Sequence, residues 1–399
     1  MRVLQINSVC GIRSTGRICT GIAEVLEKEG HECRIAYGRE DAPAEFNKYG
    51  IRISGRMAVR VSALSARLFD NAGFANKCST RRFIKKAKAF APDIIHLHNI
   101  HGYYSNLKII TDYAKKANIP VVLTLHDCWT FTGHCAHFEL AGCDRWKTGC
   151  FDCPEKKAYP TSILADNSKK NYEKKKEAFG GLDLTVVGVS DWLSRLAGES
   201  ILKNNDIVTI HNGIDLAKFK PAESDFKARY GLEGKKIILG VASEWNDAKG
   251  LADFVKLACI LGDDYRLVLA GVTEKIKNQL PESIIAIERT NSIEGLCEIY
   301  TAADVFLNMT YNDSFPTVNL EALACGTPVV TYRTGGSPEA IDDTCGAVTA
   351  ERSAESAFEA IKAVEGISAE ACIARAAQFD MNRKFGEYLK LYEDILAKK

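Results

Sequence analysis

The sequence predicts an α/β protein made of two doubly wound domains in tandem. Strand and helix patterns alternate through both halves of the 399 residues, which is typical of parallel sheets covered by helices. A chain of this length exceeds the size that one hydrophobic core usually serves. With 46% hydrophobic and 26% charged residues, the composition excludes a disordered or fibrous chain.

The first half opens with an apolar strand at residues 2–7, followed by a glycine- and serine-rich turn from Gly11 to Gly16. A helix then continues to about Gly30, because apolar residues recur on one of its faces. Further strands are expected at 93–98, 120–126 and 184–189. The lysine-rich segment 156–179 is expected to be a solvated helix.

A second series of elements begins at about residue 207. Its strands are expected at 207–210, 236–242, 266–270, near 284–287, 304–308 and 327–331, with helices between them. Asn212-Gly213 and Pro221 mark a turn-rich crossing into this half. Apolar residues at helical spacing over 381–396 predict a terminal helix with one apolar stripe that covers another surface.

Charge and apolar runs limit the class of protein. The net charge is +1, but residues 1–190 carry about +10 and the remainder about −9. The positive half could face nucleic acid, anionic lipid or a phosphorylated acceptor; nucleic acid ranks last because no binding motif accompanies the charge. No apolar run approaches the ~20 residues needed to span a bilayer. The N-terminus lacks the apolar core of a signal peptide, so we expect a cytoplasmic protein.

Ligands of doubly wound sheets bind beyond the carboxyl ends of the strands, so the polar residues there are the candidates. The turn from Gly11 to Gly16, followed by Arg17, allows close backbone approach to an anion at a helix N-terminus. It matches neither the dinucleotide-binding nor the P-loop fingerprint. The alternative is a tight turn that binds no ligand.

Histidines follow two neighbouring strands of the first half. His126 ends one apolar strand, and we expect it to be functional. His96 and His98 end the preceding strand, and their spacing sends both to one face. A metal pair is conceivable there, although a structural role for His96 is favoured.

The second half carries two polar segments where strands give way to helices. Lys249 lies where a loop enters a helix, and a lysine there can neutralise a diphosphate. The string from Asp313 to Glu321 follows a strand, and a helix begins within it near Thr317. The free N–H groups of a helix start suit phosphate, and the two carboxylates suit sugar hydroxyls.

Taken together, these segments resemble glycosyltransferase family 4, and the resemblance covers nearly the whole chain. It rests on the N-terminal strand and glycine loop, TLHD around His126, GVS at 188–190, HNGID at 211–215 before Phe219 and Pro221, Lys249-Gly250, IYTAADVFLN at 299–308, the string from Asp313 with LEALACGTPVV, and GGSPE at 335–339.

The resemblance implies a GT-B fold, in which two Rossmann-like domains face a cleft. An acceptor-binding domain is expected at 1–190, a nucleotide-sugar-binding domain at 205–378, and a helix in 379–399 that packs back on the first domain. The implied activity is retaining transfer of a hexose from a UDP- or GDP-sugar to a hydroxyl of a glycan or lipid-linked acceptor, with no metal required for catalysis.

The resemblance also implies roles for individual residues. Lys249 would bind the donor diphosphate, Asp313 the donor sugar and Glu321 the ribose. Asp313 would be assisted by the backbone N–H groups of Phe315, Thr317 and Val318. His126 would lie against the sugar ring, and Thr290 would border the base. The loop from Gly11 to Gly16, with Arg17, would border the diphosphate and the acceptor.

Two departures from the family pattern matter. Asp313 stands where the family usually has Glu and is one methylene shorter, so we expect the sugar to sit differently or to differ in kind. Ser243-Glu244 stand where the family often has Arg, so phosphate binding would depend on Lys249, helix N-termini and Arg17 or Arg333. A sugar-nucleotide hydrolase or epimerase, and a non-catalytic nucleotide-sugar binder, remain as alternatives.

The segment from Ile51 to Phe90 contains ten basic residues and one acid, Asp70. Arg56, Arg60 and Arg67 share a helical face beside apolar residues, which suits an anionic membrane surface that carries a lipid-linked acceptor. We therefore expect peripheral attachment to the inner face of the cell membrane. A solvated basic helix is the alternative.

Five of the 14 cysteines gather between Cys128 and Cys153, in a long loop that leaves the strand ending at His126. Cys135, Cys143, Cys150 and Cys153 end in a C-x-x-C pair, which resembles half of a structural zinc site. Disulfides and reduced packing cysteines are the alternatives.

Overall fold

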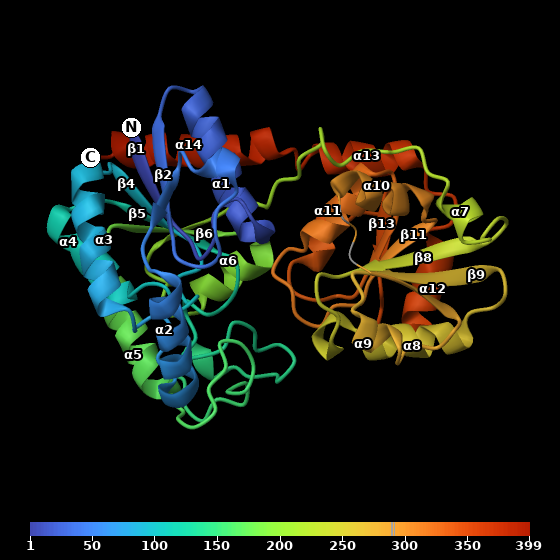
Figure 1. The fold of residues 1–399 in the computed structure, drawn as a ribbon, viewed down its shortest axis with the longest axis horizontal. Coiled ribbons are helices and arrows are strands. Elements are labelled where there is room, and N and C mark those ends of the chain that lie inside the picture. Colours follow the sequence, from blue (N-terminus) through green and yellow to red (C-terminus); the bar gives the residue numbers. More distant parts are fainter. Residues whose placement is uncertain (289, 291) are drawn as a thin grey trace. The chain divides into compact units, whose positions relative to one another are not determined.

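The protein forms two compact α/β units, seen in the computed structural model, which describes residues 1–288, 290 and 292–399 (Figure 1). The first unit comprises Met1–His211 and Asn382–Lys399, and the second comprises Asn212–Met381. Each unit is built around one sheet whose strands all run parallel. Two doubly wound domains in tandem were predicted, and this fold class is confirmed.

The first sheet has the strand order β3-β2-β1-β4-β5-β6-β7. Its strands are β1 (Arg2–Ile6), β2 (Glu32–Tyr37), β3 (Gly50–Arg52), β4 (Ile94–Leu97), β5 (Val121–Leu125), β6 (Leu184–Gly188) and β7 (Asp206–Thr209). Every residue of β4, β5 and β6 is buried, as expected for central strands covered by helices on both faces.

The helices of the first unit cover this sheet. They are α1 (Arg13–Lys28), α2 (Arg56–Phe69), α3 (Lys77–Phe90), α4 (Leu107–Ala117), α5 (Ser168–Phe179), α6 (Asp191–Gly198) and α14 (Met381–Ala397), with short 3₁₀ turns η1 (Ala44–Phe46) and η2 (Arg145–Lys147). On α1, Ile18, Ile22 and Leu26 are buried, which accounts for the apolar periodicity of this segment.

The terminal helix α14 belongs to the first unit, as the fold class predicted. Tyr392 forms a 2.7 Å hydrogen bond with His96 of β4, and Thr124 of β5 donates to the Tyr388 hydroxyl at 3.1 Å. A Cβ atom on Gly21 of α1 would lie 2.3 Å from the Phe385 ring, so glycine lets the two helices pack closely. The apolar stripe of the terminal helix therefore covers the first sheet.

The second sheet has the order β10-β9-β8-β11-β12-β13. Its strands are β8 (Lys236–Val241), β9 (Tyr265–Ala270), β10 (Ile284–Ile287), β11 (Val305–Asn308), β12 (Val329–Thr331) and β13 (Gly346–Val348). Its helices are α7 (Phe226–Arg229), α8 (Leu251–Ile260), α9 (Glu274–Lys277), α10 (Ile293–Ala302), α11 (Thr317–Ala324), α12 (Ala354–Ala363) and α13 (Ala369–Ala377), with 3₁₀ turns η3 (Asp247–Lys249) and η4 (Ser337–Ala340).

In both sheets the strand order reverses beside the first strand of the unit, at β1 and at β8. Loops that leave neighbouring strands on either side of such a reversal diverge and leave room for a ligand. The functional residues should therefore lie after β1 and β4 in the first unit, and after β8 and β11 in the second.

Three features differ from the sequence-based expectations. The strand at 206–209 pairs with β6 in the first sheet and does not open the second series, because the short helix α6 returns the chain beside β6. The strands β2, β3 and β13 were not predicted. The predicted helix at 156–179 is wrong in its first part: only 168–179 is helical, and Lys175 on it is buried.

Among the described residues, no helix has the length and apolar character needed to cross a bilayer.

Candidate functional site

In the second unit, Lys249 ends the short turn η3 between β8 and α8. The Asn246 side chain caps this turn by accepting a hydrogen bond from the Lys249 backbone N–H at 3.1 Å. Gly250 follows with φ of 75°, and a Cβ atom there would lie 2.3 Å from the Met309 carbonyl oxygen. Glycine is thus required at position 250 by a close approach of this turn to the chain after β11.

The ammonium of Lys249 reaches the loop after β11. Its Nζ lies 2.9 Å from Asp313 Oδ2 and 3.5 Å from Thr310 Oγ1. Backbone contacts join the same two loops, since the Tyr311 N–H donates to the Ala248 carbonyl at 2.8 Å. The structure therefore brings together two predicted site residues, Lys249 and Asp313, and adds Thr310, which the sequence did not indicate.

The helix α11 starts immediately after this loop, as predicted. Pro316 precedes it, and no side chain caps its first turn. Phe315 is buried, and Thr317 and Val318 form the first, partly buried turn of the helix. Glu321 lies one turn further along, where its Oε2 accepts a 3.1 Å hydrogen bond from the Tyr300 hydroxyl. An uncapped helix start carries backbone N–H groups and partial positive charge that favour an anion.

Buried polar side chains fix this end of the second sheet. Asn308 of β11 donates to Asn319 of α11 at 2.8 Å, and Asn319 donates to the Ser337 hydroxyl at 3.0 Å. The hydroxyls of Ser337 and Thr331 are 2.6 Å apart. This network holds α11 against β11, β12 and η4, and rigid support of this kind is needed for precise ligand contacts.

Thr290, predicted to border the base, lies shortly after β10 and is partly buried. Arg333, a suggested helper for phosphate, lies just after β12 and is exposed. Neither residue has a described contact with the pair of Lys249 and Asp313.

In the first unit, the loop after β1 is a tight turn. The Gly11 N–H donates to the Gly16 carbonyl at 3.1 Å, and Gly11 has φ of 73°. No side chain caps the start of α1, and Arg17 in its first turns is exposed. The geometry suits the predicted anion-binding turn.

His126 follows β5 and contacts His98, which follows β4. The His126 Nε2 and His98 Nδ1 atoms are 2.9 Å apart, and the planes of the two rings differ by only 17°, with centroids 5.2 Å apart. Burial lowers the pKa of His126 to about 4, and it lowers the pKa of His98 well below its usual value. Both imidazoles are therefore neutral at physiological pH.

His96 of β4 and His98, which follows β4, do not face a shared metal position. Both nitrogens of His96 are engaged, by Thr124 and Tyr392 at 2.7 Å each. Both nitrogens of His98 are engaged as well, by His126 and by Gln5, which lies 3.0 Å away on β1. The structural role favoured for His96 agrees with these contacts, and Gln5 is a functional candidate that the sequence analysis missed.

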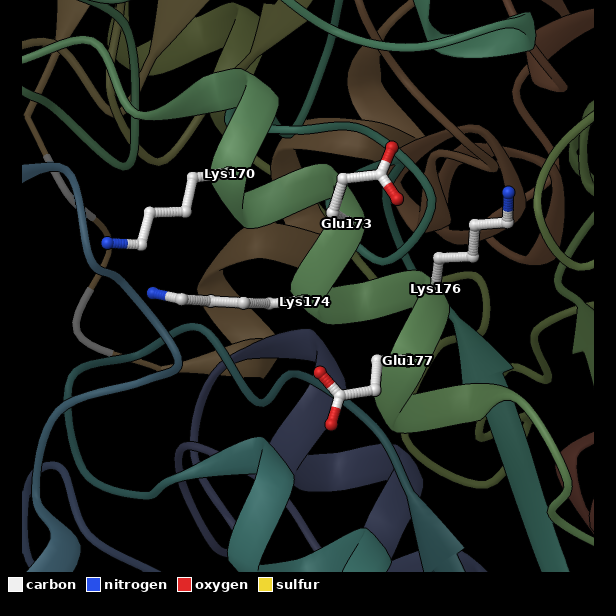
Figure 2. A pocket seen from close by; sticks show the side chains of 5 residues that line it. All are labelled: Lys170, Glu173, Lys174, Lys176 and Glu177. Atoms are coloured by element: carbon white, nitrogen blue, oxygen red, sulfur yellow. The ribbon is translucent and has the colours of Figure 1, made fainter.

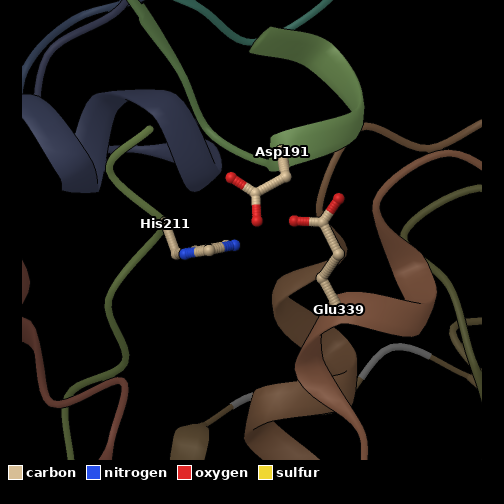
Figure 3. Close-up of side chains that lie close together, drawn as sticks. All are labelled: Asp191, His211 and Glu339. Atoms are coloured by element: carbon tan, nitrogen blue, oxygen red, sulfur yellow. The ribbon is translucent and has the colours of Figure 1, made fainter. Parts of the chain in front are cut away.

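The same edge of the first sheet carries two further residues. Asp191 begins α6 after β6, and His211 follows β7, with their ligand atoms no more than 4.8 Å apart (Figure 3). Glu339, also drawn in Figure 3, belongs to η4 of the second unit. Asp191 was not singled out by the sequence, although it directly follows the GVS segment of the resemblance.

The cysteine loop is long and irregular, as predicted, and contains the short 3₁₀ helix η2. Cys135, Cys143, Cys150 and Cys153 line one small cavity with Trp146 and Phe138. All four are free thiols, and a hydrogen bond joins those of Cys135 and Cys153. No three of these side chains, all in the described part of the chain, bring their sulfur atoms within 4.8 Å of one another.

Lys175 of α5 forms hydrogen bonds to the backbone of this loop. Its Nζ donates to the carbonyls of Trp129 and Thr132 and lies 3.4 Å from the centre of the Trp129 indole ring. Burial lowers the pKa of Lys175 to about 7. The loop also holds His134, whose Nδ1 lies 2.5 Å from the Asp70 carboxylate.

The exposed side of α5 forms a shallow charged surface (Figure 2). Lys170 and Lys174 extend to the same side of the helix there. Burial, Lys170 and Lys77 of α3 together lower the pKa of Lys174. Glu173 and Glu177 line the same surface, so its charge is mixed.

Two family profiles match the chain. The profile described as Glycosyltransferase Family 4 matches residues 15–218, and the profile described as Glycosyl transferases group 1 matches residues 223–379. The chain is 24% identical over 371 residues to WcaC of Escherichia coli (strain K12), a glycosyl transferase assigned to colanic acid biosynthesis, with 88% of each chain covered.

Solved structures share the fold. Sucrose-phosphate synthase from Thermosynechococcus elongatus superposes with a TM-score of 0.70 at 16% identity and covers 100% of both chains. Anabaena HepE in complex with UDP gives a TM-score of 0.70 at 14% identity, over 99% of this chain and 100% of that one. The chain therefore belongs to glycosyltransferase family 4, and it is a nucleotide-sugar glycosyltransferase with the two-domain GT-B fold.

Proposed function

We propose that the protein is a retaining hexosyltransferase that uses a UDP- or GDP-sugar and transfers the hexose to a hydroxyl of a glycan or a lipid-linked acceptor. The observation that carries the proposal is the position of Lys249 beside Asp313, at the carboxyl end of the second sheet and next to the uncapped start of α11. A cation, a carboxylate and free helix amides gathered at this edge match the parts of a nucleotide sugar.

Lys249 is assigned to the donor diphosphate. As the sugar leaves, negative charge grows on the diphosphate, and a fixed ammonium stabilises that charge more in the transition state than in the ground state. No arginine stands at Ser243 or Glu244 to share this task. The amides at the start of α11 supply the remaining positive potential, with Arg17 or Arg333 as further cations.

The other residues are assigned to the remaining parts of the donor. Asp313 accepts hydrogen bonds from sugar hydroxyls, assisted by the backbone N–H groups of Phe315, Thr317 and Val318. Glu321 accepts from the ribose hydroxyls, and Thr290 borders the base. In the first unit, His126 is assigned to the sugar ring, and the turn from Gly11 to Gly16 is assigned to the diphosphate and the acceptor.

Retention of configuration follows from attack on the face from which the diphosphate departs. The bond between the anomeric carbon and the diphosphate oxygen breaks, and the acceptor oxygen bonds to the same face of that carbon. The acceptor proton passes to the departing phosphate oxygen. Neutral His126 serves binding in this scheme, and no metal is needed because Lys249 and the helix amides stabilise the leaving group.

The relatives support the choice of substrates. HepE is described in complex with UDP, and WcaC is assigned to colanic acid biosynthesis. By analogy, we assign this chain to bacterial polysaccharide or glycolipid synthesis.

A thermal-shift screen of nucleoside diphosphates and their sugars tests the donor. A true donor at 100 times its Kd should stabilise the protein by about 2.7 kcal/mol. Transfer is then measured with and without glycan acceptors. Release of free sugar from donor alone, at a rate that acceptors do not change, would indicate a hydrolase. Tight binding with no turnover would indicate a non-catalytic binder.

The surface of α2 supports attachment to a membrane. Four apolar side chains of α2 are between 57% and 71% exposed: Met57, Val61, Leu64 and Phe69. Ile163 and Leu164, in the loop that precedes α5, are exposed to a similar degree. The backbone N–H of Ile163 donates to the Arg67 carbonyl at 2.7 Å, so the loop is fixed beside the end of α2.

Basic residues are also present on α2, at Arg60, at Arg67 and at Arg56, which forms an ion pair with Asp41. The helix α5 carries Lys170 and Lys174 (Figure 2). Apolar groups enter the interface while cations meet anionic headgroups. We propose peripheral attachment of the first unit to the inner face of the cell membrane, where a lipid-linked acceptor resides.

A structural zinc on Cys135, Cys143, Cys150 and Cys153 stays a prediction. The four thiols line one cavity, which favours it, but their sulfur atoms lie too far apart to form a ready tetrahedral set. A bound ion would have to draw them inward and would order the loop in doing so.

A further inference from the structure

A chain of buried polar groups leads from the interior of the first sheet to His126. It consists of Gln5 on β1, His98 after β4 and His126 after β5. Gln5 and His98 are almost completely inaccessible to solvent, whereas His126 is partly exposed. Because no bulk water reaches Gln5 or His98, each hydrogen bond must have one donor and one acceptor within the protein.

The orientation of the Gln5 amide is fixed by its other neighbours. Its Nε2 donates to the Cys19 carbonyl of α1 at 2.8 Å and to the Cys33 sulfur of β2 at 3.3 Å. The reversed amide would place two carbonyl oxygens against one another at the Cys19 contact, which is repulsive. Oε1 of Gln5 therefore faces His98 Nε2, at 3.0 Å.

An amide oxygen only accepts, so His98 Nε2 must carry a proton. Full burial keeps His98 neutral, and a neutral imidazole has one N–H group, which leaves its Nδ1 without a proton. His98 Nδ1 lies 2.9 Å from His126 Nε2, so His126 Nε2 must be the donor. The direction of both hydrogen bonds in the series from Gln5 through His98 to His126 therefore follows from the contact of Gln5 with the Cys19 carbonyl.

We propose that Gln5 and His98 are positioning residues that hold His126 as its Nε2–H tautomer, so that the His126 Nδ1 atom presents a lone pair to a hydroxyl of the donor sugar. Only the identity of that hydroxyl group rests on the proposed function. A lone pair at Nδ1 accepts from a hydroxyl and rejects a carbonyl or a phosphate oxygen, which carry no proton. His126 then selects a sugar hydroxyl and does not donate a proton to the leaving group.

The tautomer is measured without any substrate. In protein labelled with ¹⁵N histidine, long-range ¹H–¹⁵N correlation spectra at pH 7 distinguish protonated from unprotonated ring nitrogens, and His126→Asn identifies the signals of His126. We expect protonated Nε2 and unprotonated Nδ1 for both His98 and His126. A His126 that is charged or carries its proton on Nδ1 would overturn the proposal.

Gln5→Met removes the acceptor while keeping the volume of the side chain. His98 then loses its fixed direction, and we expect His126 to give a mixture of tautomers. Tyr392→Phe is the matched control, because it removes a hydrogen bond from the neighbouring buried His96 and leaves the chain to His126 intact. A folded Gln5→Met protein with an unchanged single tautomer contradicts the proposal; if this variant does not fold, the wild-type spectrum alone decides.

Affinity measurements test whether the tautomer of His126 affects binding of the donor sugar. Gln5→Met should weaken binding of a sugar nucleotide about fivefold, the equivalent of one hydrogen bond, and leave the corresponding nucleoside diphosphate unaffected. The probes are UDP with UDP-glucose, and GDP with GDP-mannose. Equal losses for both members of a pair would contradict a role toward the sugar. If wild-type protein binds none of the four, the proposed function fails while the spectra still judge the tautomer.

Discussion

The ammonium of Lys249 lies 2.9 Å from the carboxylate of Asp313, and this contact joins the loops that follow β8 and β11. Both side chains are partly exposed, so the ion pair contributes little to stability. A diphosphate carries more negative charge than Asp313 and can take over the ammonium at small cost. Under the proposed assignment, the donor diphosphate would replace Asp313 beside Lys249, and Asp313 would then be free to bind the sugar.

Glu321→Ala should weaken binding of the free nucleoside diphosphate as well as of the sugar nucleotide, by about 10-fold or more. Glu321 is assigned to the ribose hydroxyls, and both ligands contain the ribose, so loss of this carboxylate should weaken both. Isothermal titration calorimetry measures both affinities. Glu359→Ala is the control, since Glu359 is an exposed carboxylate on α12 whose described partner is Lys362. Equal affinities for the wild-type and Glu321→Ala proteins would remove Glu321 from the nucleotide site.

Lys175 makes stability depend on pH. Its pKa is about 7 in the folded protein and near 10.5 in the unfolded chain, so between these values the unfolded state binds one more proton. The free energy of unfolding should therefore rise with pH from 7 to 9, by up to about 1.4 kcal/mol per pH unit from this group. Below pH 7 the penalty is constant.

Urea unfolding at several pH values, compared between wild type and Lys175→Met, isolates this contribution. The difference in stability between the two proteins should change steadily over pH 7–9. A constant difference over that range would show that Lys175 is charged in the folded protein.

Membrane attachment should depend on both the apolar and the basic side chains of α2. Wild-type protein should sediment with liposomes that contain anionic lipid, less so in high salt, and not with purely zwitterionic ones. Replacing Met57, Val61 and Leu64 together by serine should abolish co-sedimentation. Ile260→Ser, an exposed apolar change in the second unit, should leave it intact. Sedimentation that ignores both lipid charge and salt would leave α2 as a solvated basic helix.

The cysteine loop can be tested by metal analysis of protein purified without chelator, together with a count of free thiols. About one zinc per chain is expected, and Cys153→Ser should remove it, whereas Cys259→Ser on the exposed side of α8 should not. Absence of metal with four unreactive thiols would indicate disulfides, and absence of metal with four reactive thiols would indicate packing cysteines.

The sequence predicts the central strands well, because β4, β5 and the inner residues of β8 are buried and mostly apolar. It misses β3 and β13, which have three residues each, too few for a pattern to be recognised. It also misses the six-residue β2, whose sequence mixes charged and apolar residues. The strand β7 was placed in the wrong series, since its sequence does not reveal which sheet it joins.

The candidate site divides in the same way. Lys249, Asp313 and the start of α11 are local features at strand ends, so they could be found from the sequence. The contact between Lys249 and Asp313 joins residues 64 positions apart and needs the fold. Gln5 could have been noticed, because a glutamine inside a buried apolar strand must have polar partners, but only the structure shows that one of them is His98.

The central claim is that Lys249 stabilises the departing diphosphate. The most direct test measures the rate at which nucleoside diphosphate is released from the sugar nucleotide identified by the thermal-shift screen, in the presence of water or an acceptor. Lys249→Ala should lower this rate about 100-fold or more, because the main cation at the developing charge is lost. Lys256→Ala, a change at an exposed lysine of the adjacent α8, should release the diphosphate at the wild-type rate. Near-normal release by Lys249→Ala would contradict the account.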